Sequence, residues 1–95
     1  MAEVRIPTIL RTYTADQRAV PAAGDTVAAI IDDLEANHAG IKERLVDNDE
    51  VRRFVNIYVD DEDIRFTGGL DTAVKDASTV VILPAVAGGS AAIAR

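Results

Sequence analysis

A pair of glycines near the C-terminus, Gly88 and Gly89, is the feature of this 95-residue chain with the clearest chemical potential. The pair follows an apolar, β-branched run at 80–83, then Pro84 and three small residues at 85–87. Glycine has no Cβ, so a narrow enzyme tunnel can close around such a segment without a steric clash. The pattern predicts a last core strand that continues as a thin arm, suited to placing a backbone carboxyl group in another protein's active site.

The chemistry open to Gly89 is that of a carboxylate. ATP can convert a carboxylate into an acyl-adenylate, and sulfide or a partner's persulfide can then displace AMP to leave a thiocarboxylate. Gly88 and Ala87 would be recognised together with Gly89, because bulky side chains there would block the adenylating enzyme.

In this sequence the carboxyl group of Gly89 lies in a peptide bond with Ser90. We therefore expect proteolysis between Gly89 and Ser90 to precede the carboxylate chemistry. Two alternatives are that residues 90–95 are not native to the protein, or that Gly89 never carries a group.

Three other polar features predict structure rather than catalysis. His38 is the single histidine, near the expected end of a helix and without an evident nucleophile or second metal ligand. Residues 60–63 are all acidic, but they lack the twelve-residue ligand spacing of a calcium loop, so they indicate a solvated turn. Gly68-Gly69 lacks the Lys and Ser/Thr of a phosphate loop and indicates a turn with positive φ. The sequence predicts no metal site and no catalytic residue.

Composition narrows the class of protein. Ninety-five residues make one domain, and a formal charge of −6 argues against nucleic acid as a partner. This charge suits partners with basic docking surfaces, or serves solubility alone. The absence of cysteine excludes disulfides, thiolate zinc sites and cysteine nucleophiles. The longest apolar run, 80–87, is too short to span a membrane, and without a signal peptide we expect a cytoplasmic location.

Hydrophobic periodicity predicts the elements that must position the arm. The clearest is a helix in which Val27, Ile30, Ile31 and Leu34 form one apolar stripe, with Asp25 or Thr26 as its cap and Gly40 as its end. A further helical turn is expected at 41–46, a solvated loop at 47–50 and a short helical turn near Leu70. Strands are expected at 3–11, 17–22, 54–59, 64–66 and 79–83. In the first strand Val4, Ile6, Thr8 and Leu10 share one face, and a turn at 14–16 leads to the second. The order predicts an α+β fold of the ubiquitin-like β-grasp kind, with a mixed sheet gripping one main helix and a flexible C-terminal tail.

The chain resembles the MoaD/ThiS family of ubiquitin-like sulfur carriers. The resemblance lies in residues 54–66 (FVNIYVDDEDIRF), Gly69-Leu70 and residues 80–89 (VVILPAVAGG). Residues 6–10 (IPTIL) and 33–37 (DLEAN) extend it, so it covers residues 3–89. Within the family the chain is most similar to the CysO type, which is used for cysteine synthesis.

This resemblance implies a β-grasp domain over residues 1–89 and an extension, 90–95, that is removed or disordered. It implies a carrier without enzymatic activity or a bound cofactor, with sulfur held as a thiocarboxylate on Gly89. The implied partners are an E1-like adenylating and sulfur-transferring enzyme that uses ATP, a PLP-dependent sulfhydrylase, and a JAMM-type zinc metalloprotease. Some family members are trimmed by a metalloprotease of the same type.

Other functions fit the same residues. A ubiquitin-like modifier joined to target lysines through Gly89 would use the same glycine pair, and a plain interaction module would keep its tail. Within the carriers, molybdopterin, thiamine or a specialised metabolite could receive the sulfur instead of cysteine. Docking to the adenylating enzyme should use the arm and nearby sheet surface, with Phe54, Phe66 and Leu83 as candidate contacts if they are exposed.

Overall fold

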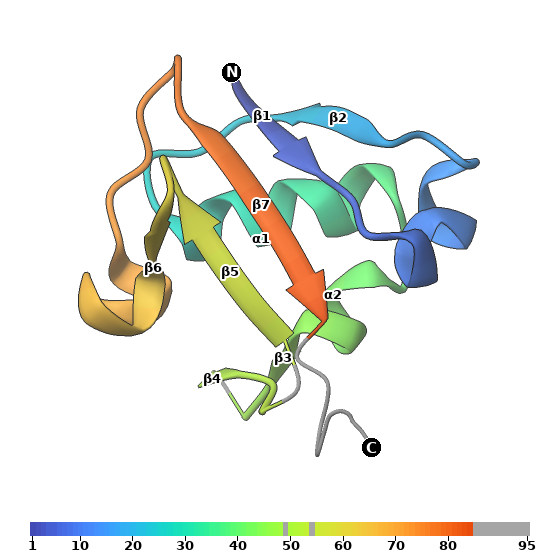
Figure 1. The fold of residues 1–95 in the computed structure, drawn as a ribbon. Coiled ribbons are helices and arrows are strands. Elements are labelled where there is room, and N and C mark those ends of the chain that lie inside the picture. The colour runs from blue at the N-terminus through green and yellow to red at the C-terminus, as the bar shows by residue number, and fades with distance from the viewer. Residues whose placement is uncertain (49, 54, 85–95) are drawn as a thin grey trace.

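Five strands form one mixed sheet in the part of the chain that the structure describes, residues 1–48, 50–53 and 55–84 of a computed structural model (Figure 1). The sheet order is β2 (Ala19–Ala22), β1 (Ala2–Arg5), β7 (Thr79–Pro84), β5 (Val55–Val59) and β6 (Glu62–Asp63). β7 is central, pairing parallel with β1 and antiparallel with β5. The pairs β1–β2 and β5–β6 are antiparallel. Because both edges of β7 are paired, hydrogen bonds to β1 and β5 fix the position of β7 in the sheet.

Helix α1 (Val27–Asn37) lies across one face of the sheet, as Figure 1 shows. It begins after Thr26, whose Oγ1 accepts a hydrogen bond of 3.2 Å from the Ala29 amide. Such a cap satisfies one of the free N–H groups of the first helical turn. The predicted helix is confirmed, with Thr26 as its cap. Among the described residues, no helix is long and apolar enough to cross a membrane.

The core lies between α1 and the sheet. The four residues of the predicted helical stripe are all buried. Alternate strand residues face them, as a side-chain period of two requires; these are Ala2, Val4, Val20, Ala22, Ile57, Val59, Val80 and Ile82. Each fully buried aliphatic side chain stabilises the fold by about 1.5–3 kcal/mol. The predicted mixed sheet gripping one main helix is therefore confirmed.

The first strand is shorter than the predicted range 3–11. β1 ends at Arg5, and residues Thr8–Thr14 form the 3-10 helix η1. Pro7 explains the change, because it has no N–H to continue the sheet ladder. Its carbonyl instead accepts a hydrogen bond from the Leu10 amide at 2.9 Å. Leu10 is still buried, as predicted, but Thr8 is exposed, and η1 replaces the simple hairpin turn expected at 14–16.

The chain after β5 also departs from prediction. Residues 64–66 were expected as a strand, but β6 covers only Glu62–Asp63, and Ile64–Phe66 is the 3-10 helix η2. The Asp63 carboxylate accepts a hydrogen bond of 2.9 Å from the Arg65 amide. Such a local bond offers the backbone an alternative to the sheet ladder. A further 3-10 helix, η3 (Gly69–Asp71), stands where a short helical turn was predicted.

A small hairpin that the sequence did not predict follows helix α2 (Ile41–Leu45). It consists of β3 (Val46–Asp47) and β4 (Glu50–Val51), which pair antiparallel in a region expected to be a helix end and a solvated loop. Asn48 in its turn has φ +52, a left-handed conformation that asparagine tolerates well. The hairpin forms one wall of the groove described below.

The predicted acidic turn at 60–63 is confirmed in its first half, where Asp60 and Asp61 have φ of +50 and +72 between β5 and β6. The Asp60 carboxylate accepts hydrogen bonds from the Thr79 amide at 3.0 Å and the Ser78 hydroxyl at 2.8 Å. These two bonds, the amide first, lower the pKa of Asp60 below its usual value. Asp60 thus ties this turn to the beginning of β7.

Candidate functional site

The candidate site is the end of β7, where the predicted arm begins. Val55, the first residue of β5, is in register with Pro84, the last of β7. The Arg65 guanidinium donates a hydrogen bond of 3.1 Å to the Val55 carbonyl and so links η2 to the beginning of β5, next to the end of β7. Ala87, Gly88, Gly89 and Ser90, together with the predicted extension 90–95, lie outside the described residues. The structure therefore describes the platform on which the predicted chemistry depends.

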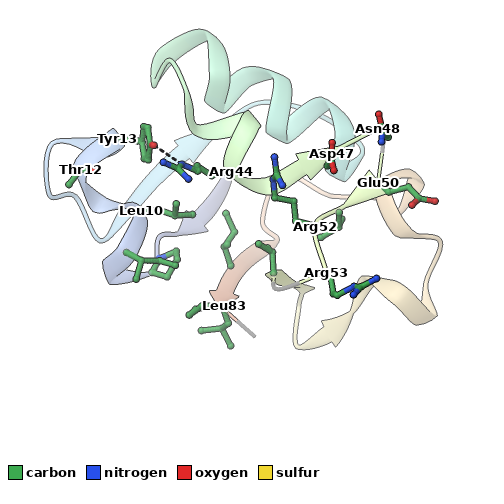
Figure 2. Close-up of a pocket in the computed structure, with 16 residues that line it drawn as sticks. Leu10, Thr12, Tyr13, Arg44, Asp47, Asn48, Glu50, Arg52, Arg53 and Leu83 are labelled. Atoms are coloured by element: carbon green, nitrogen blue, oxygen red, sulfur yellow. Dashed lines mark hydrogen bonds between the residues drawn. The ribbon is translucent and has the colours of Figure 1, made fainter. Parts of the chain in front are cut away.

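A broad, open groove of about 1080 Å³ lies beside this end of β7 (Figure 2). One wall is η1 with Leu10, Thr12 and Tyr13, and the other is the β3–β4 hairpin with the two residues that follow it. Ile82, Leu83 and Pro84 of β7 also line it. The groove is thus built from segments that are distant in the sequence.

Tyr13 and Arg44 form a polar contact in the groove. The Arg44 Nε donates a hydrogen bond of 2.8 Å to the Tyr13 hydroxyl, and its guanidinium carbon lies 6.0 Å from the ring centroid. The hydrogen bond raises the pKa of Arg44. A guanidinium is charged at physiological pH in any environment. A Cβ on Gly40, which has φ +97, would lie 3.1 Å from the Tyr13 ring. Gly40 thus lets α2 approach η1 closely.

Two exposed apolar side chains lie beside the end of β7. Ile9 is 66% exposed and Leu83 is 45% exposed. Both line a second, smaller groove that runs between η1 and β7. Of the predicted docking residues, Leu83 and Phe66 are exposed, Phe66 at 87%, and Phe54 lies outside the described residues. Phe66 lies on η2 and lines neither groove.

The other sequence features have structural roles. His38 is the C-terminal cap of α1, and its amide donates to the Leu34 carbonyl at 2.6 Å, as its predicted place at a helix end requires. Gly68 and Gly69 have φ of +119 and +61, so they form the predicted turn. Within the described ranges, no three His, Cys, Asp or Glu side chains are grouped so that they could hold a metal ion.

The sequence reasoning missed the arginines that line the groove. Arg44, Arg52 and Arg53 come from α2 and from the segment after β4. Figure 2 shows Arg44 beside Tyr13, with Arg52 and Arg53 toward the other wall. In the sequence, the adjacent arginines at 52 and 53 were the only sign of a basic surface. They did not show which other segments would line the groove.

Comparison with known proteins identifies the family. The family model described as "ThiS family" matches residues 4–89. The chain belongs to the ThiS family. This confirms the predicted resemblance, because the match spans both the sheet and the predicted arm.

Two relatives are informative for this ThiS-family chain. It is 61% identical over 89 residues to "Sulfur carrier protein CysO" of Mycobacterium tuberculosis, a match that covers 90% of this chain and 96% of that protein. In the solved structure of the Amycolatopsis orientalis BexX/CysO complex, the matching chain superposes with a TM-score of 0.90 at 58% identity, covering 94% of this chain and all of that one. The predicted ubiquitin-like β-grasp fold is thereby confirmed.

A third relative bears on the alternative functions. The chain is 34% identical over 64 residues to "Small archaeal modifier protein 3" of Haloferax volcanii, which covers 67% of this chain and 70% of that protein. The alignment is shorter and less similar than the alignment with CysO.

Proposed function

We propose that this chain is a sulfur carrier protein that holds sulfur as a thiocarboxylate on Gly89 and delivers it to a biosynthetic enzyme, with cysteine synthesis as the destination. The observation that carries the proposal is the 61% identity to the mycobacterial sulfur carrier CysO over almost the whole of that protein. The family match also runs through residue 89, the position that would bear the sulfur. The central position of β7, the strand that precedes the predicted arm in the sequence, supports it further.

The proposed chemistry takes place on the carrier, but the activating partner catalyses it. The Gly89 carboxylate attacks the α-phosphorus of ATP, a carbon–oxygen–phosphorus linkage forms, and pyrophosphate leaves. Hydrosulfide then adds to the acyl carbon, the bond from that carbon to the AMP oxygen breaks, and loss of a proton leaves the thiocarboxylate. The carrier thus acts as a co-substrate rather than as an enzyme.

Processing must come first, because Ser90 follows Gly89 in the sequence. Hydrolysis of the Gly89–Ser90 peptide bond would release the carboxylate. We assign this step to a JAMM-type zinc metalloprotease, and sulfur loading to an E1-like adenylating enzyme. A PLP-dependent sulfhydrylase would then accept the sulfur. The support for partner enzymes is that the Amycolatopsis orientalis relative was solved in a complex with BexX.

A protein modifier is the second candidate, and the 34% identity to an archaeal modifier protein favours it. A modifier would use the same activated carboxyl group of Gly89. A lysine amine of a target protein, rather than sulfide, would displace AMP. The two functions therefore differ in their products: an isopeptide-linked adduct for a modifier, and a free thiocarboxylate for a carrier.

The decisive experiment measures the intact mass of the protein from its native host and sequences its C-terminal peptide. The carrier function predicts a chain that ends at Gly89 with one carboxylate oxygen replaced by sulfur. This gain nominally equals oxidation of Met1, so fragmentation must locate it at the C-terminus. Adducts on target lysines would instead establish a modifier, and a native chain that still carries residues 90–95 and no sulfur would refute the proposal.

A variant test complements the mass measurement. Replacing Gly89 by leucine should abolish thiocarboxylate formation, because a side chain there would block the tunnel of the activating enzyme. Circular dichroism serves as the control, since residue 89 lies outside the described sheet and helices. A Gly89→Leu protein that still becomes loaded with sulfur would contradict the assignment of Gly89.

A further inference from the structure

The two ends of β7 differ in charge. Near its beginning lie three carboxylates, Asp60, Asp61 and Asp76, and two positive charges, Lys75 and the N-terminal amine, which leaves a formal charge of −1. The Thr79 amide donates to Asp60, and the N-terminal amine lies 3.9 Å from Asp76. Counting only the described residues, the grooves that border Pro84 at its other end are lined by five arginines and two carboxylates, a formal charge of +3; these residues are Arg5, Arg11, Arg44, Arg52, Arg53, Asp47 and Glu50. The end from which the arm leaves is therefore basic, although the chain as a whole carries −6.

Most of these arginines have no carboxylate partner in the described part of the chain. Arg5 pairs with Glu3 at 3.2 Å, whereas Arg44 donates to the Tyr13 hydroxyl. Arg11 and Arg52 donate through Nε to the carbonyl oxygens of Ile6 and Glu43, at 3.3 Å and 2.7 Å.

Arg53 is exposed and makes no hydrogen bond or ion pair with any described residue. No described residue therefore competes for its five N–H donors. A guanidinium presents these donors in a planar fork that matches a carboxylate.

Exposed apolar residues line the same grooves as the arginines. Ile9, Leu83 and Pro84 are exposed and line the grooves between the arginines. An apolar centre with a polar rim is the usual anatomy of a protein interface, and arginine is enriched in such interfaces. We call these three residues with Arg11, Arg44, Arg52 and Arg53 the exit surface.

The predicted arm is short, so the exit surface must lie close to the partner when Gly89 reacts. Five residues separate Pro84 from the carboxyl group of Gly89, and a fully extended chain covers at most about 3.6 Å per residue. Gly89 can therefore reach a reacting phosphate only if Pro84 lies within about 18 Å of it. The enzyme surface around the tunnel entrance must then lie close to the exit surface.

The local charge, rather than the net charge, governs this contact. The six residues of β7 span about 20 Å, which is more than two Debye lengths at physiological ionic strength. Solvent-exposed acidic groups at the far end are thus largely screened from a partner that touches the exit surface. The net charge predicted basic docking surfaces, but the exit surface is complementary to acidic ones.

We propose that the exit surface docks against an acidic rim around the tunnel entrance of the adenylating enzyme, with Arg53 as a principal contact. This inference rests on the proposed carrier function. It adds the chemical character of the partner's surface and the residues of this chain that recognise it.

The test compares two charge reversals in the mature chain that ends at Gly89, which retains all the described residues. Arg53→Glu changes the exit surface, and Lys75→Glu makes the same change in net charge near the other end of β7. Thiocarboxylate formation by the host's adenylating enzyme, with ATP and sulfide, gives KM and kcat for each protein at low and high sodium chloride.

We expect Arg53→Glu to raise KM about fivefold with little change in kcat, and Lys75→Glu to leave KM within about twofold, because interfacial charges act through close complementary pairs. The wild-type KM should rise with salt, and the rise should be smaller for Arg53→Glu. Thermal melts should match the wild type, since Arg53 has no described partner.

Equal KM values for the two variants, or a wild-type KM independent of salt, would overturn the docking proposal and leave the carrier function intact. A wild-type chain that is not loaded at all would overturn the carrier function and the docking proposal with it. The two failures are thus distinguishable in one experiment.

Discussion

Gly24 allows the segment between β2 and α1 to pack closely against the first turn of α1. Replacing Gly24 by alanine tests how tightly this segment and the helix are packed. Its φ is +154, a conformation that residues with a side chain rarely adopt. A Cβ at this position would lie 2.8 Å from the Cβ of Ala29 and 2.8 Å from the amide nitrogen of Ile30. The backbone of α1 would have to shift to admit one methyl group.

The expected loss in free energy of unfolding is the sum of two energetic penalties. A side chain held in a sparsely populated backbone region costs about 1–3 kcal/mol, and overpacking costs about 1–3 kcal/mol more. We therefore expect Gly24→Ala to lower the free energy of unfolding by about 2–6 kcal/mol. A small domain has only about 5–15 kcal/mol in total, so this loss is a large part of its stability.

Gly69→Ala is the matched control. Gly69 also has positive φ, +61, but apart from its chain neighbours no atom of a described residue lies within 4 Å of an added Cβ. Left-handed strain of about 1–2 kcal/mol is then partly offset by the lower entropy of the unfolded alanine chain. Urea unfolding of both variants gives the two free energies, and a Gly24→Ala loss no larger than the Gly69→Ala loss would refute the packing argument.

Two further predictions test the core and the Asp60 contact. Leu34→Ala should lower the free energy of unfolding by about 3 kcal/mol, because the Leu34 side chain is 1% exposed. Phe66→Ala is the control and should change this free energy by less than about 0.5 kcal/mol, because Phe66 is 87% exposed. Similar losses for the two variants in urea unfolding would contradict the burial of Leu34. The pKa of Asp60 is lowered in the folded state, so its contribution to stability is present above the ordinary carboxyl pKa and is lost as the pH falls through the folded value. Asp60→Asn should therefore lower Tm at pH 7 and narrow its difference from the wild type toward pH 3, and a Tm difference that does not change with pH would contradict this linkage.

Local patterns were enough to predict most of the framework. The stripe of α1 repeats every three to four residues, and the strands at β5 and β7 combine β-branched residues with alternation. Glycines at 40, 68 and 69 stood where positive φ was needed. The same local residues carried the family resemblance, which the match over residues 4–89 confirms.

Predictions failed where nearby interactions competed with the pattern. The alternation from Val4 to Leu10 suggested one long strand, but Pro7 removes the donor that the sheet would need. Similarly, the Asp63 carboxylate bonds the Arg65 amide and favours η2 over a returning strand. Periodicity alone cannot weigh such bonds against a sheet ladder.

The sequence by itself determined the family, and it predicted a last core strand that leads into an arm ending in Gly88-Gly89. Only the tertiary structure decided the charge at the end of that strand. Arg11 lies in η1, Arg44 in α2 and Arg53 in the segment after β4, and the fold brings them to the grooves that border Pro84. A net charge averages over the whole chain, whereas a partner in salt solution responds to the charges within about one Debye length of its own surface. For this reason an acidic chain can present a basic surface where its arm begins.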